Sequence, residues 1–391
     1  MAEEKLKSEI MTKHIFIICG EPSGDLHAAG LTRALREISP EVKISGVGGP
    51  LLRAAGAELF CDIKGLAVFG LFEALKKLPQ FFALQKIVLQ KIKLKNPDAI
   101  ILVDFSGFNL RLARAINKTI PVIYYISPQV WASRPGRLEG IKRYVHKMIV
   151  FLKFEEEFYK KAGIEVEFVG HPLIDIVKPT MSKKEFLSGL GLTETKTTVA
   201  LLPGSRQKEI ENILPIMLAS AELIRQGFGE AQFVIAKAAA VDWEIYREIM
   251  KKFNLEMKLA EGKTYDCLAA ADFALVCSGT ATLETAILEK PFCVIYKMGF
   301  LSYLLYRPQV KLPYIGMANI VAREKIVPEF IQFNARPKKI AAETLKIIKD
   351  SARMRQMRDA LARVKSALGP PGAALRAGQI IVNSLTEFSL A

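Results

Sequence analysis

The 391-residue sequence has few cysteines and few histidines, and neither type is grouped. The five cysteines are odd in number, form no CxxC pair and stand mostly in apolar runs, so we expect reduced core thiols rather than a disulfide framework. The four histidines form no metal-ligand cluster, and we expect neither a metal nor a cofactor. Low-complexity tracts and short internal repeats are missing too, which, with 50% hydrophobic residues, excludes a disordered or fibrous chain.

Long apolar runs and acidic charge are also scarce. The longest uncharged stretch, Thr119–Ser133, contains two prolines and is too short to cross a bilayer. Residues 1–12 alternate Glu and Lys without the apolar segment of a signal peptide, so we expect a flexible extension and a cytoplasmic location. With 40 acidic against 55 basic residues, the net charge of +15 favours an anionic partner: nucleic acid, a membrane surface or a phosphorylated substrate.

Short apolar segments alternate with stretches of helical period along most of the chain. This order predicts an α/β fold with doubly wound parallel sheets, because strands covered by helices on both faces are apolar throughout. The pattern lapses between Pro172 and Thr197. We therefore expect two Rossmann-like domains at 13–172 and 198–367, joined by a linker at 173–197 and facing a cleft.

The expected elements follow from these patterns. The strands are expected at 14–19, 42–47, 99–104, 122–126, 148–152, 167–169, 199–202, 232–236, 273–277 and 292–296. The helices are expected at 26–38, 69–78, 81–94, 110–117, 137–145, 155–162, 209–225, 243–253, 265–270 and 283–288, and from 337 to the end with a break at 369–372.

Polar loops follow the expected strands of the first half. Gly20-Glu21-Pro22-Ser23-Gly24-Asp25 can place capped helix amides before a ligand, or can be only a tight turn. Its spacing is not GxGxxG, which disfavours nicotinamide or flavin binding. Asp104 ends the third strand, where a partly desolvated carboxylate can serve as a general base or can merely cap the next helix.

Two other segments of the first half each have two interpretations. The loop Tyr124–Trp131 suits a sugar or an acyl chain, but aromatic side chains also pack in cores. Residues 76–95 include six lysines and no acid, which suits either an anionic membrane surface or a helix on the sheet with a solvated lysine face. Nucleic acid fits less well, because no nucleic-acid-binding motif accompanies the charge. The residues expected at a membrane are Lys76, Lys77, Phe81, Phe82 and Lys86.

Two loops of the second half are candidates for phosphate binding. Gly204-Ser205-Arg206 offers amides and a guanidinium to a diphosphate at the start of a helix. Ser278-Gly279-Thr280-Ala281-Thr282 offers amides and hydroxyls, and Glu284 can accept hydrogen bonds from a ribose; helix capping is the alternative. Neither loop has P-loop spacing.

A set of motifs in a fixed order covers nearly the whole chain after Met11. It comprises Gly20–Asp25, Asp104 with Asn109, Tyr125–Ala132, Phe168–Pro172, Leu202–Arg206 with Glu209, Ser278–Glu284, Tyr296–Met298 and Ala318–Ile320. The set resembles the lipid A disaccharide synthase family, inverting glycosyltransferases of the two-Rossmann GT-B type. The chain departs from the family at Gly107, where a second acid is common, and at Ser133 in place of Trp. Before Asn319 it has Gly316-Met317-Ala318, where Leu-Pro-Asn is common.

The resemblance implies a reaction and a set of residue roles. 2,3-Diacylglucosamine would pass from UDP-2,3-diacylglucosamine to the 6-hydroxyl of 2,3-diacylglucosamine 1-phosphate (lipid X) with inversion, giving a β(1→6) tetraacyl disaccharide 1-phosphate and UDP. Asp104 would be the base, and Arg206 with nearby amides would stabilise the departing UDP in place of a metal. The implied donor-binding residues are Gly204, Ser205, Arg206, Ser278, Gly279, Thr280, Thr282, Glu284 and Asn319. The implied acceptor-binding residues are Glu21, Ser23, Asp25, Asn109, Gln129 and Trp131.

The resemblance also carries expectations about partners. It implies peripheral contact with the inner face of the cytoplasmic membrane, and a helix at 368–391 that packs back on the first domain or is exchanged within a homodimer. The alternatives are another GT-B enzyme that uses UDP-N-acetylglucosamine, namely a peptidoglycan glycosyltransferase or a 2-epimerase, or a membrane-surface binding protein without catalysis. The epimerase would bring more acids and histidines to the cleft.

Overall fold

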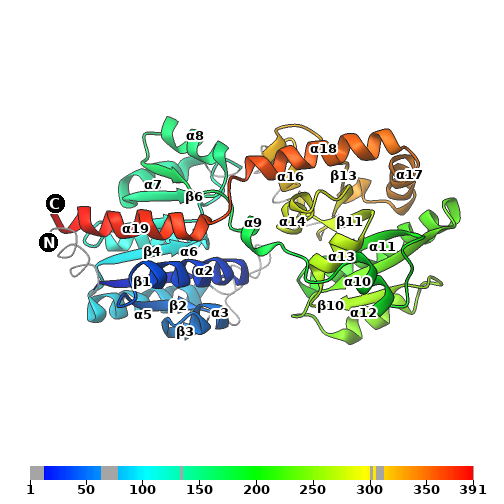
Figure 1. Ribbon diagram of the computed structural model, residues 1–391. Helices are drawn as coiled ribbons and strands as arrows, with labels where there is room; N and C mark the ends of the chain where they lie inside the picture. The colour runs from blue at the N-terminus through cyan, green and yellow to red at the C-terminus, as the bar shows by residue number, and fades with distance from the viewer. Residues whose placement is uncertain (1–12, 63–77, 133–134, 300–302, 305–311, 391) are drawn as a thin grey trace. The chain divides into compact units, whose positions relative to one another are not determined.

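The computed structural model describes residues 13–62, 78–132, 135–299, 303–304 and 312–390 (Figure 1). The described residues divide into two compact units: unit 1 holds those up to Pro172 and from Leu368 onward, and unit 2 those from Leu173 to Ala367. Each unit contains one parallel sheet whose strands alternate with helices along the chain. The predicted α/β class with doubly wound parallel sheets is confirmed.

Unit 1 is built on seven described strands in the order β3-β2-β1-β4-β5-β6-β7. The strand order reverses at β1, which pairs in parallel with both β2 and β4. The strands are β1 (His14–Cys19), β2 (Lys43–Gly48), β3 (Glu58–Asp62), β4 (Ala99–Val103), β5 (Val122–Tyr125), β6 (Lys147–Val150) and β7 (Val166–Phe168). The helices are α2 (Pro22–Ile38), α3 (Pro50–Ala54), α5 (Leu78–Lys95), α6 (Ser106–Ile116), α7 (Leu138–Tyr144), α8 (Lys153–Lys161) and α19 (Ala373–Leu390), with a 3-10 turn at Pro135–Arg137.

The core of unit 1 lies on both faces of this sheet, because side chains alternate along each strand. In β1, Ile15 and Ile17 belong to one buried cluster, together with residues of α2 and α19. Phe16 and Ile18 belong to the other, with residues of α5, α6, α7 and α8. The C-terminal helix α19 (red) lies alongside α2 (blue) in Figure 1, so the last described helix completes the core of unit 1.

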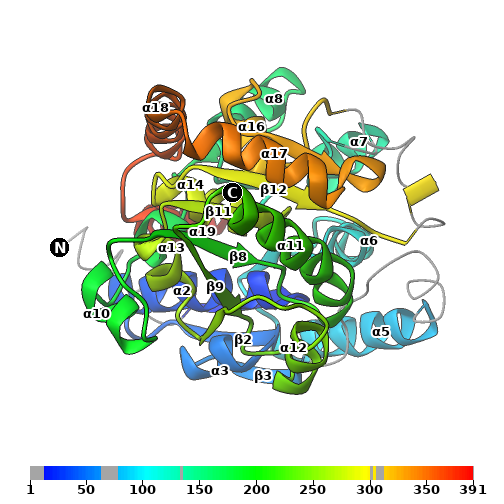
Figure 2. The same cartoon turned by 90° about the vertical axis from the view of Figure 1, so that its right-hand side faces the viewer.

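Unit 2 has six described strands in the order β10-β9-β8-β11-β12-β13. Here β8 pairs in parallel with both β9 and β11, so the order reverses between β8 and β11. The helix α17 packs along α11, as Figure 2 shows. The strands are β8 (Thr197–Leu202), β9 (Ala231–Lys237), β10 (Lys258–Glu261), β11 (Phe273–Cys277), β12 (Phe292–Tyr296) and β13 (Glu329–Ile331). The helices are α9 (Leu173–Ile176), α10 (Lys183–Gly189), α11 (Gln207–Gly227), α12 (Trp243–Met250), α13 (Thr264–Ala270), α14 (Ala281–Ile287), α16 (Met317–Ala322), α17 (Pro337–Ile348) and α18 (Ser351–Ala367), with a 3-10 turn at Gln332–Asn334.

Three strands were not expected from the sequence: β3, β10 and β13. Each is an edge strand in its sheet. Their sequences are short and mix charged with apolar residues, and most of their side chains are only partly buried. An edge strand has a neighbouring strand on one side only and is more exposed to solvent. It therefore lacks the continuous apolar run that marks the central strands.

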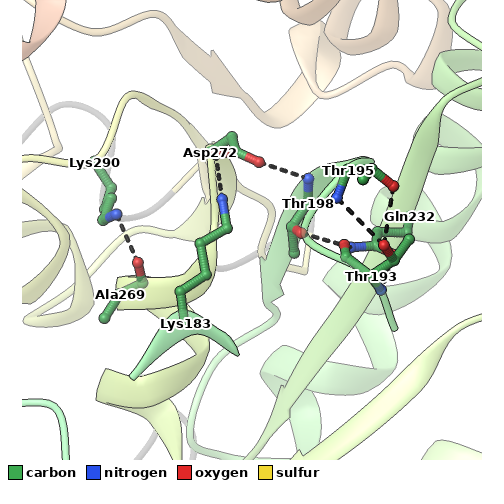
Figure 3. Close-up of polar contacts among 8 residues, drawn as sticks. All are labelled: Lys183, Thr193, Thr195, Thr198, Gln232, Ala269, Asp272 and Lys290. Carbon is green, nitrogen blue, oxygen red and sulfur yellow. Dashed lines mark hydrogen bonds and ion pairs between the residues drawn. The ribbon is translucent and has the colours of Figure 1, made fainter. Parts of the chain in front are cut away.

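The segment after Pro172 holds the short helices α9 and α10 and is fastened to the sheet of unit 2. The Lys183 ammonium lies 2.7 Å from a carboxylate oxygen of Asp272, whose other oxygen accepts the backbone amide of Thr198 at 2.8 Å (Figure 3). Gln232 on β9 donates to the Thr193 carbonyl at 2.6 Å and to the Thr198 hydroxyl at 2.8 Å. These contacts tie residues 183–198 to the amino ends of β8, β9 and β11.

Two expectations from the sequence concern the segment before α5 and the crossing of a membrane. The helix expected at 69–78 lies almost wholly outside the described residues, as do Lys76 and Lys77. Among the helices that the structure describes, none is both long and apolar enough to cross a bilayer.

Two glycines provide a matched test of this fold. Gly46 in β2 has φ +154°, and a Cβ there would lie 1.8 Å from the carbonyl oxygen of Ile17. Gly30 in α2 has no atom within 4 Å of such a Cβ. We expect Gly46→Ala to lower the free energy of unfolding by about 3 kcal/mol or more, and Gly30→Ala to raise it by about 0.5–1 kcal/mol. Urea unfolding of both variants measures this, and a stable Gly46→Ala protein would contradict the β1–β2 packing.

Candidate functional site

In each unit the candidate residues lie at the carboxyl edge of the sheet, where the strand order reverses. In unit 1 the loops after β1 and β4 carry Glu21 and Asp104, and these two strands are paired. In unit 2 the loops after β8 and β11 carry Arg206 and Ser278–Thr280, and these strands are paired as well. Open α/β sheets bind ligands at this reversal point, because the neighbouring loops diverge and leave room between them.

Asp104 has an unusual backbone at the junction of β4 and α6. Its φ is +47° and that of Phe105 is +43°, so two consecutive non-glycine residues are left-handed. The ring of Phe105 passes so close to Gly20 that a Cβ at Gly20 would lie 2.3 Å from it. Backbone strain of this kind persists only where surrounding contacts enforce it, and it is common at functional sites.

The contacts that enforce this conformation are made by the backbone of Asp104. Its amide donates to the Tyr125 carbonyl at 3.3 Å. Its carbonyl accepts the Tyr124 hydroxyl at 2.7 Å and the Asn109 side-chain amide at 2.9 Å. Asn109 is completely buried and also donates to the Val103 carbonyl at 3.2 Å. Asn109 therefore holds the Asp104 backbone in place.

The carboxyl group of Asp104 has a raised pKa. Burial, and to a lesser extent the nearby Glu21 carboxylate, raise its pKa to about 7, while the Phe105 amide acts in the opposite direction. A carboxylate with a pKa near the working pH is a better base than an ordinary aspartate, yet it is still substantially ionised. This environment suits a group that removes a proton from a hydroxyl.

The loop after β1 divides into exposed and structural residues. Glu21 is the N-cap of α2 and is partly exposed, and its negative charge raises the pKa of the Asp104 carboxyl. Ser23 is exposed. Asp25 is only 2% exposed, and its oxygens accept the amides of Gly49, Leu51 and Leu52 at 2.8–3.1 Å. The Asp25 carboxylate therefore caps the amino end of α3.

The loop after β5 presents one exposed and one half-anchored side chain. Gln129 is exposed, whereas Trp131 is partly buried and donates its indole N–H to Glu155 at 2.9 Å. The Trp131 ring meets Phe154 edge to face, with 4.9 Å between centroids. One edge of the indole is therefore fixed inside the protein.

In unit 2, the carboxylate of Glu209 accepts hydrogen bonds from the Gly204–Arg206 turn. Gly204 has φ +121°, which favours glycine. Glu209, in the first turn of α11, accepts the amides of Ser205 at 3.0 Å and Arg206 at 3.3 Å. Glu209 also lies 3.3 Å from the Arg206 guanidinium, whose side chain is 45% exposed. The amides of Ser205 and Arg206, which were expected to hold a diphosphate, are thus already bonded to Glu209, while the Arg206 guanidinium remains partly exposed.

The turn after β11 leaves amides accessible. Gly279 has φ +148°, and both it and Thr280 are exposed. Among the described residues none accepts a hydrogen bond from the amides of Gly279 and Thr280. The two turns are neighbours because they follow the paired strands β8 and β11. Two amides and a guanidinium at one sheet edge can bind phosphate oxygens.

Several neighbours expected to bind the donor directly are occupied within the protein. The Thr282 hydroxyl is fully buried, donates to the Gly279 carbonyl at 2.8 Å and accepts the Met317 amide at 3.0 Å. The Ser278 hydroxyl donates to the Ile315 carbonyl at 3.1 Å. These hydroxyls shape the turn and join it to residues 315–317.

Asn319 is also internal. It is completely buried, donates to the Val327 carbonyl and to Glu329 at 2.9 and 2.8 Å, and accepts the amides of Ile326 and Val327 at 2.9 Å. Glu329 in turn accepts the amides of Ile315 and Gly316 at 3.0 and 2.9 Å. Asn319 therefore supports the loop against the turn after β11.

Glu284 lies beside the turn after β11. It lies one turn into α14, and the Tyr265 hydroxyl donates to it at 3.3 Å. Burial raises the pKa of Glu284, opposed by this hydrogen bond. It is partly exposed and retains acceptor capacity.

Sequence analysis missed Glu155 and Glu329 and named Tyr124 only as the start of an aromatic loop, whereas all three hold the loops in place. Each makes its contact with a residue 10 to 28 positions away, so no local spacing could reveal it. Among the residues that the structure describes, no group of three His, Cys, Asp or Glu side chains is arranged to hold a metal ion.

Comparisons with known proteins identify one family. A family model described as lipid-A-disaccharide synthetase matches residues 15–380. The curated lipid-A-disaccharide synthase of Syntrophus aciditrophicus is 45% identical over 94% of this chain and 96% of its own length. That of Geobacter sulfurreducens is 38% identical, covering 97% and 99% respectively.

Similar solved structures bear on the fold alone, because they are distant in sequence. The calicheamicin glycosyltransferase CalG4 has a TM-score of 0.62 at 15% identity, covering 96% of this chain and 99% of its own. A putative UDP-N-acetylglucosamine 2-epimerase from Listeria monocytogenes has a TM-score of 0.63 at 14% identity, covering 96% and 97%. The expected two-Rossmann fold is confirmed by these likenesses.

The raised pKa of Asp104 predicts a cost in stability. Asp104 binds its proton more tightly in the folded state than in the unfolded state, so its contribution to the free energy of unfolding falls as pH rises from about 4 to about 7. Asp104→Asn removes this cost, and Asn tolerates the left-handed backbone. We expect the variant to exceed wild type by about 2–4 kcal/mol at pH 8, with a gap that narrows toward pH 4. Urea unfolding at several pH values measures the gap; a gap independent of pH would contradict the shift.

Proposed function

The chain belongs to the lipid-A-disaccharide synthase family, and from this premise we propose how its two sets of loops divide the work of sugar transfer. The family reaction moves 2,3-diacylglucosamine from its UDP donor to the 6-hydroxyl of 2,3-diacylglucosamine 1-phosphate, forming a β(1→6) bond and releasing UDP. The chain is accordingly assigned as a glycosyltransferase of lipid A biosynthesis. The 2-epimerase and peptidoglycan glycosyltransferase alternatives are not supported by its relatives.

We propose that unit 1 holds the acceptor and supplies the base. Asp104 removes the proton from the acceptor 6-hydroxyl as that oxygen attacks the anomeric carbon from the face opposite UDP, which inverts the configuration. The observation that carries this role is the Asp104 carboxyl, with a pKa of about 7 on a left-handed backbone at the sheet reversal point. Glu21, Ser23, Gln129 and Trp131 are the remaining acceptor-side candidates, and Asn109 acts through the Asp104 backbone.

We propose that unit 2 binds the donor and stabilises the leaving group. Negative charge grows on the UDP diphosphate as the glycosidic bond breaks, and the transition state at the sugar resembles an oxocarbenium ion. The Arg206 guanidinium and the amides of Gly279 and Thr280 are placed at one sheet edge to receive that charge. Glu284 accepts from the ribose, while Ser278, Thr282 and Asn319 hold the turn in shape.

Replacing the base tests the division directly. We expect Asp104→Asn to lower kcat by two orders of magnitude or more, because general-base assistance is worth about 10²–10⁴-fold. UDP affinity, measured by calorimetry, stays within about twofold, since the donor groups lie in the other unit. In wild type, kcat/KM declines below pH 7, where Asp104 takes up its proton.

A matched control for this test is Glu41→Gln, which removes an exposed carboxylate of unit 1 and leaves kcat unchanged. Near-wild-type turnover in Asp104→Asn would reject the base assignment. A simultaneous loss of UDP affinity would reject the division between the units.

We also propose that α5 contacts an anionic membrane surface, where both acylated substrates reside. Its solvent face exposes Phe82, Ile87 and Leu94 at 56%, 47% and 74%, with Lys86 and Lys93 also exposed. Phe81 is not part of this proposed surface, because its ring packs inside unit 1, with its centroid 5.7 Å from that of Phe105 and 6.5 Å from that of Phe108. Apolar side chains flanked by ammonium groups suit an interface with anionic headgroups.

Co-sedimentation with vesicles that contain phosphatidylglycerol tests this proposal. We expect the triple variant Phe82→Ser, Ile87→Ser, Leu94→Ser to lower the bound fraction at least about tenfold, since each buried CH₂ group contributes about 0.8 kcal/mol. Trp243→Ser removes an exposed apolar side chain from unit 2 and serves as the control. Unchanged sedimentation of the triple variant would reject the α5 surface.

A further inference from the structure

Glu155 is a buried carboxylate that the sequence analysis did not use. It lies in the first turn of α8 and is 5% exposed. No described lysine or arginine forms an ion pair with it. Burial raises its pKa, and hydrogen bonds from Ser127 and Trp131 oppose the shift. A carboxyl group removed from water is costly unless its acceptor positions are filled, so its partners indicate what it does.

The two partners lie at opposite ends of one loop. Ser127 Oγ donates to Glu155 Oε1 at 2.8 Å, and Trp131 Nε1 donates to the same oxygen at 2.9 Å. Both ends of the loop are therefore bonded to one atom, Glu155 Oε1. The Tyr159 hydroxyl, also on α8, reinforces it by donating to the Pro128 carbonyl at 2.9 Å and to Ser127 Oγ at 3.2 Å.

The loop enters through a strained residue. Ile126 has φ +68°, which is unfavourable for a β-branched side chain. Its amide still donates to the Ile149 carbonyl, at 3.2 Å. Such a conformation persists only where neighbouring contacts determine it, and the Glu155 contacts begin at the next residue.

The same loop is joined to the proposed base. Tyr124 and Tyr125, which precede it, contact the Asp104 carbonyl and amide at 2.7 and 3.3 Å. Gln129 is exposed between the two anchored ends, and Trp131 keeps a partly exposed ring. A fixed loop therefore sets where these two side chains stand relative to Asp104.

We propose that Glu155 is a positioning residue for the acceptor, which it serves by holding Ser127 and Trp131 so that Gln129 and the Trp131 ring orient the acceptor sugar beside Asp104. This rests on the proposed function, since it takes the loop after β5 as part of the acceptor site. Glu155 touches no substrate, and its effect passes through the loop alone.

The test is steady-state kinetics of Glu155→Gln with each substrate varied separately. The amide has the same size but places an NH₂ group where the carboxylate was only an acceptor, which weakens hydrogen bonds that a charged group strengthens. The acceptor KM is expected to rise about tenfold, while the donor KM and UDP affinity change less than about twofold. Glu157→Gln, an exposed carboxylate on the same helix, is the matched control.

A second variant keeps the test valid if Glu155→Gln does not fold. Ser127→Ala removes the hydroxyl that donates to Glu155 Oε1 and leaves the Trp131 ring intact, and it is expected to raise the acceptor KM to a similar extent. In the double variant the two effects should not add, because both break one interaction.

Three outcomes would overturn the positioning role: an unchanged acceptor KM in both single variants, an equal rise in donor and acceptor KM, or additive effects in the double variant. A wild-type protein that releases no UDP from acylated donor and acceptor refutes the proposed function instead, so the two failures are distinguishable.

Discussion

The account depends on one constrained residue, Asp104 at the end of β4. Its backbone is left-handed, as is that of Phe105, and it is held there by the Tyr124 hydroxyl, the Asn109 amide and the Tyr125 carbonyl. The same junction buries the carboxyl group next to Glu21, which raises its pKa to about 7. Strain and desolvation are both unfavourable for folding, and both would be lost if the surrounding contacts relaxed. We interpret their retention as the consequence of a catalytic requirement.

The candidate site residues fall into two groups, one exposed at the sheet edges and one buried and bonded within the protein. Arg206, Thr280, Glu284, Glu21 and Gln129 are exposed or partly exposed at the reversal points of the two sheets. Asn109, Asp25, Thr282 and Asn319 are buried and have hydrogen-bond partners within their own unit. A family motif therefore contains both kinds of residue, and only the geometry distinguishes them. Under the proposed function, loss of a buried residue would alter ligand binding by displacing the exposed ones.

The sequence was sufficient for the central architecture and insufficient for its edges and its supporting contacts. The apolar runs predicted β1, β4, β8 and β11, and the polar loops after them mark the sites proposed here. The edge strands β3, β10 and β13 carry no such run, because solvent covers one side of each. The roles of Glu155 and Glu329 depend on tertiary contacts, which no periodicity encodes. Glu209 shows the same limit, since its position three residues after Arg206 did not reveal that it occupies the turn's amides.

The central claim is that the Asp104 carboxyl titrates near neutrality in the folded protein. Infrared difference spectroscopy of the carboxyl C=O stretch, with the Asp104→Asn spectrum subtracted at each pH, isolates this one group. The account predicts a protonation midpoint near pH 7. A midpoint near 4, the ordinary value for an exposed aspartate, would contradict it.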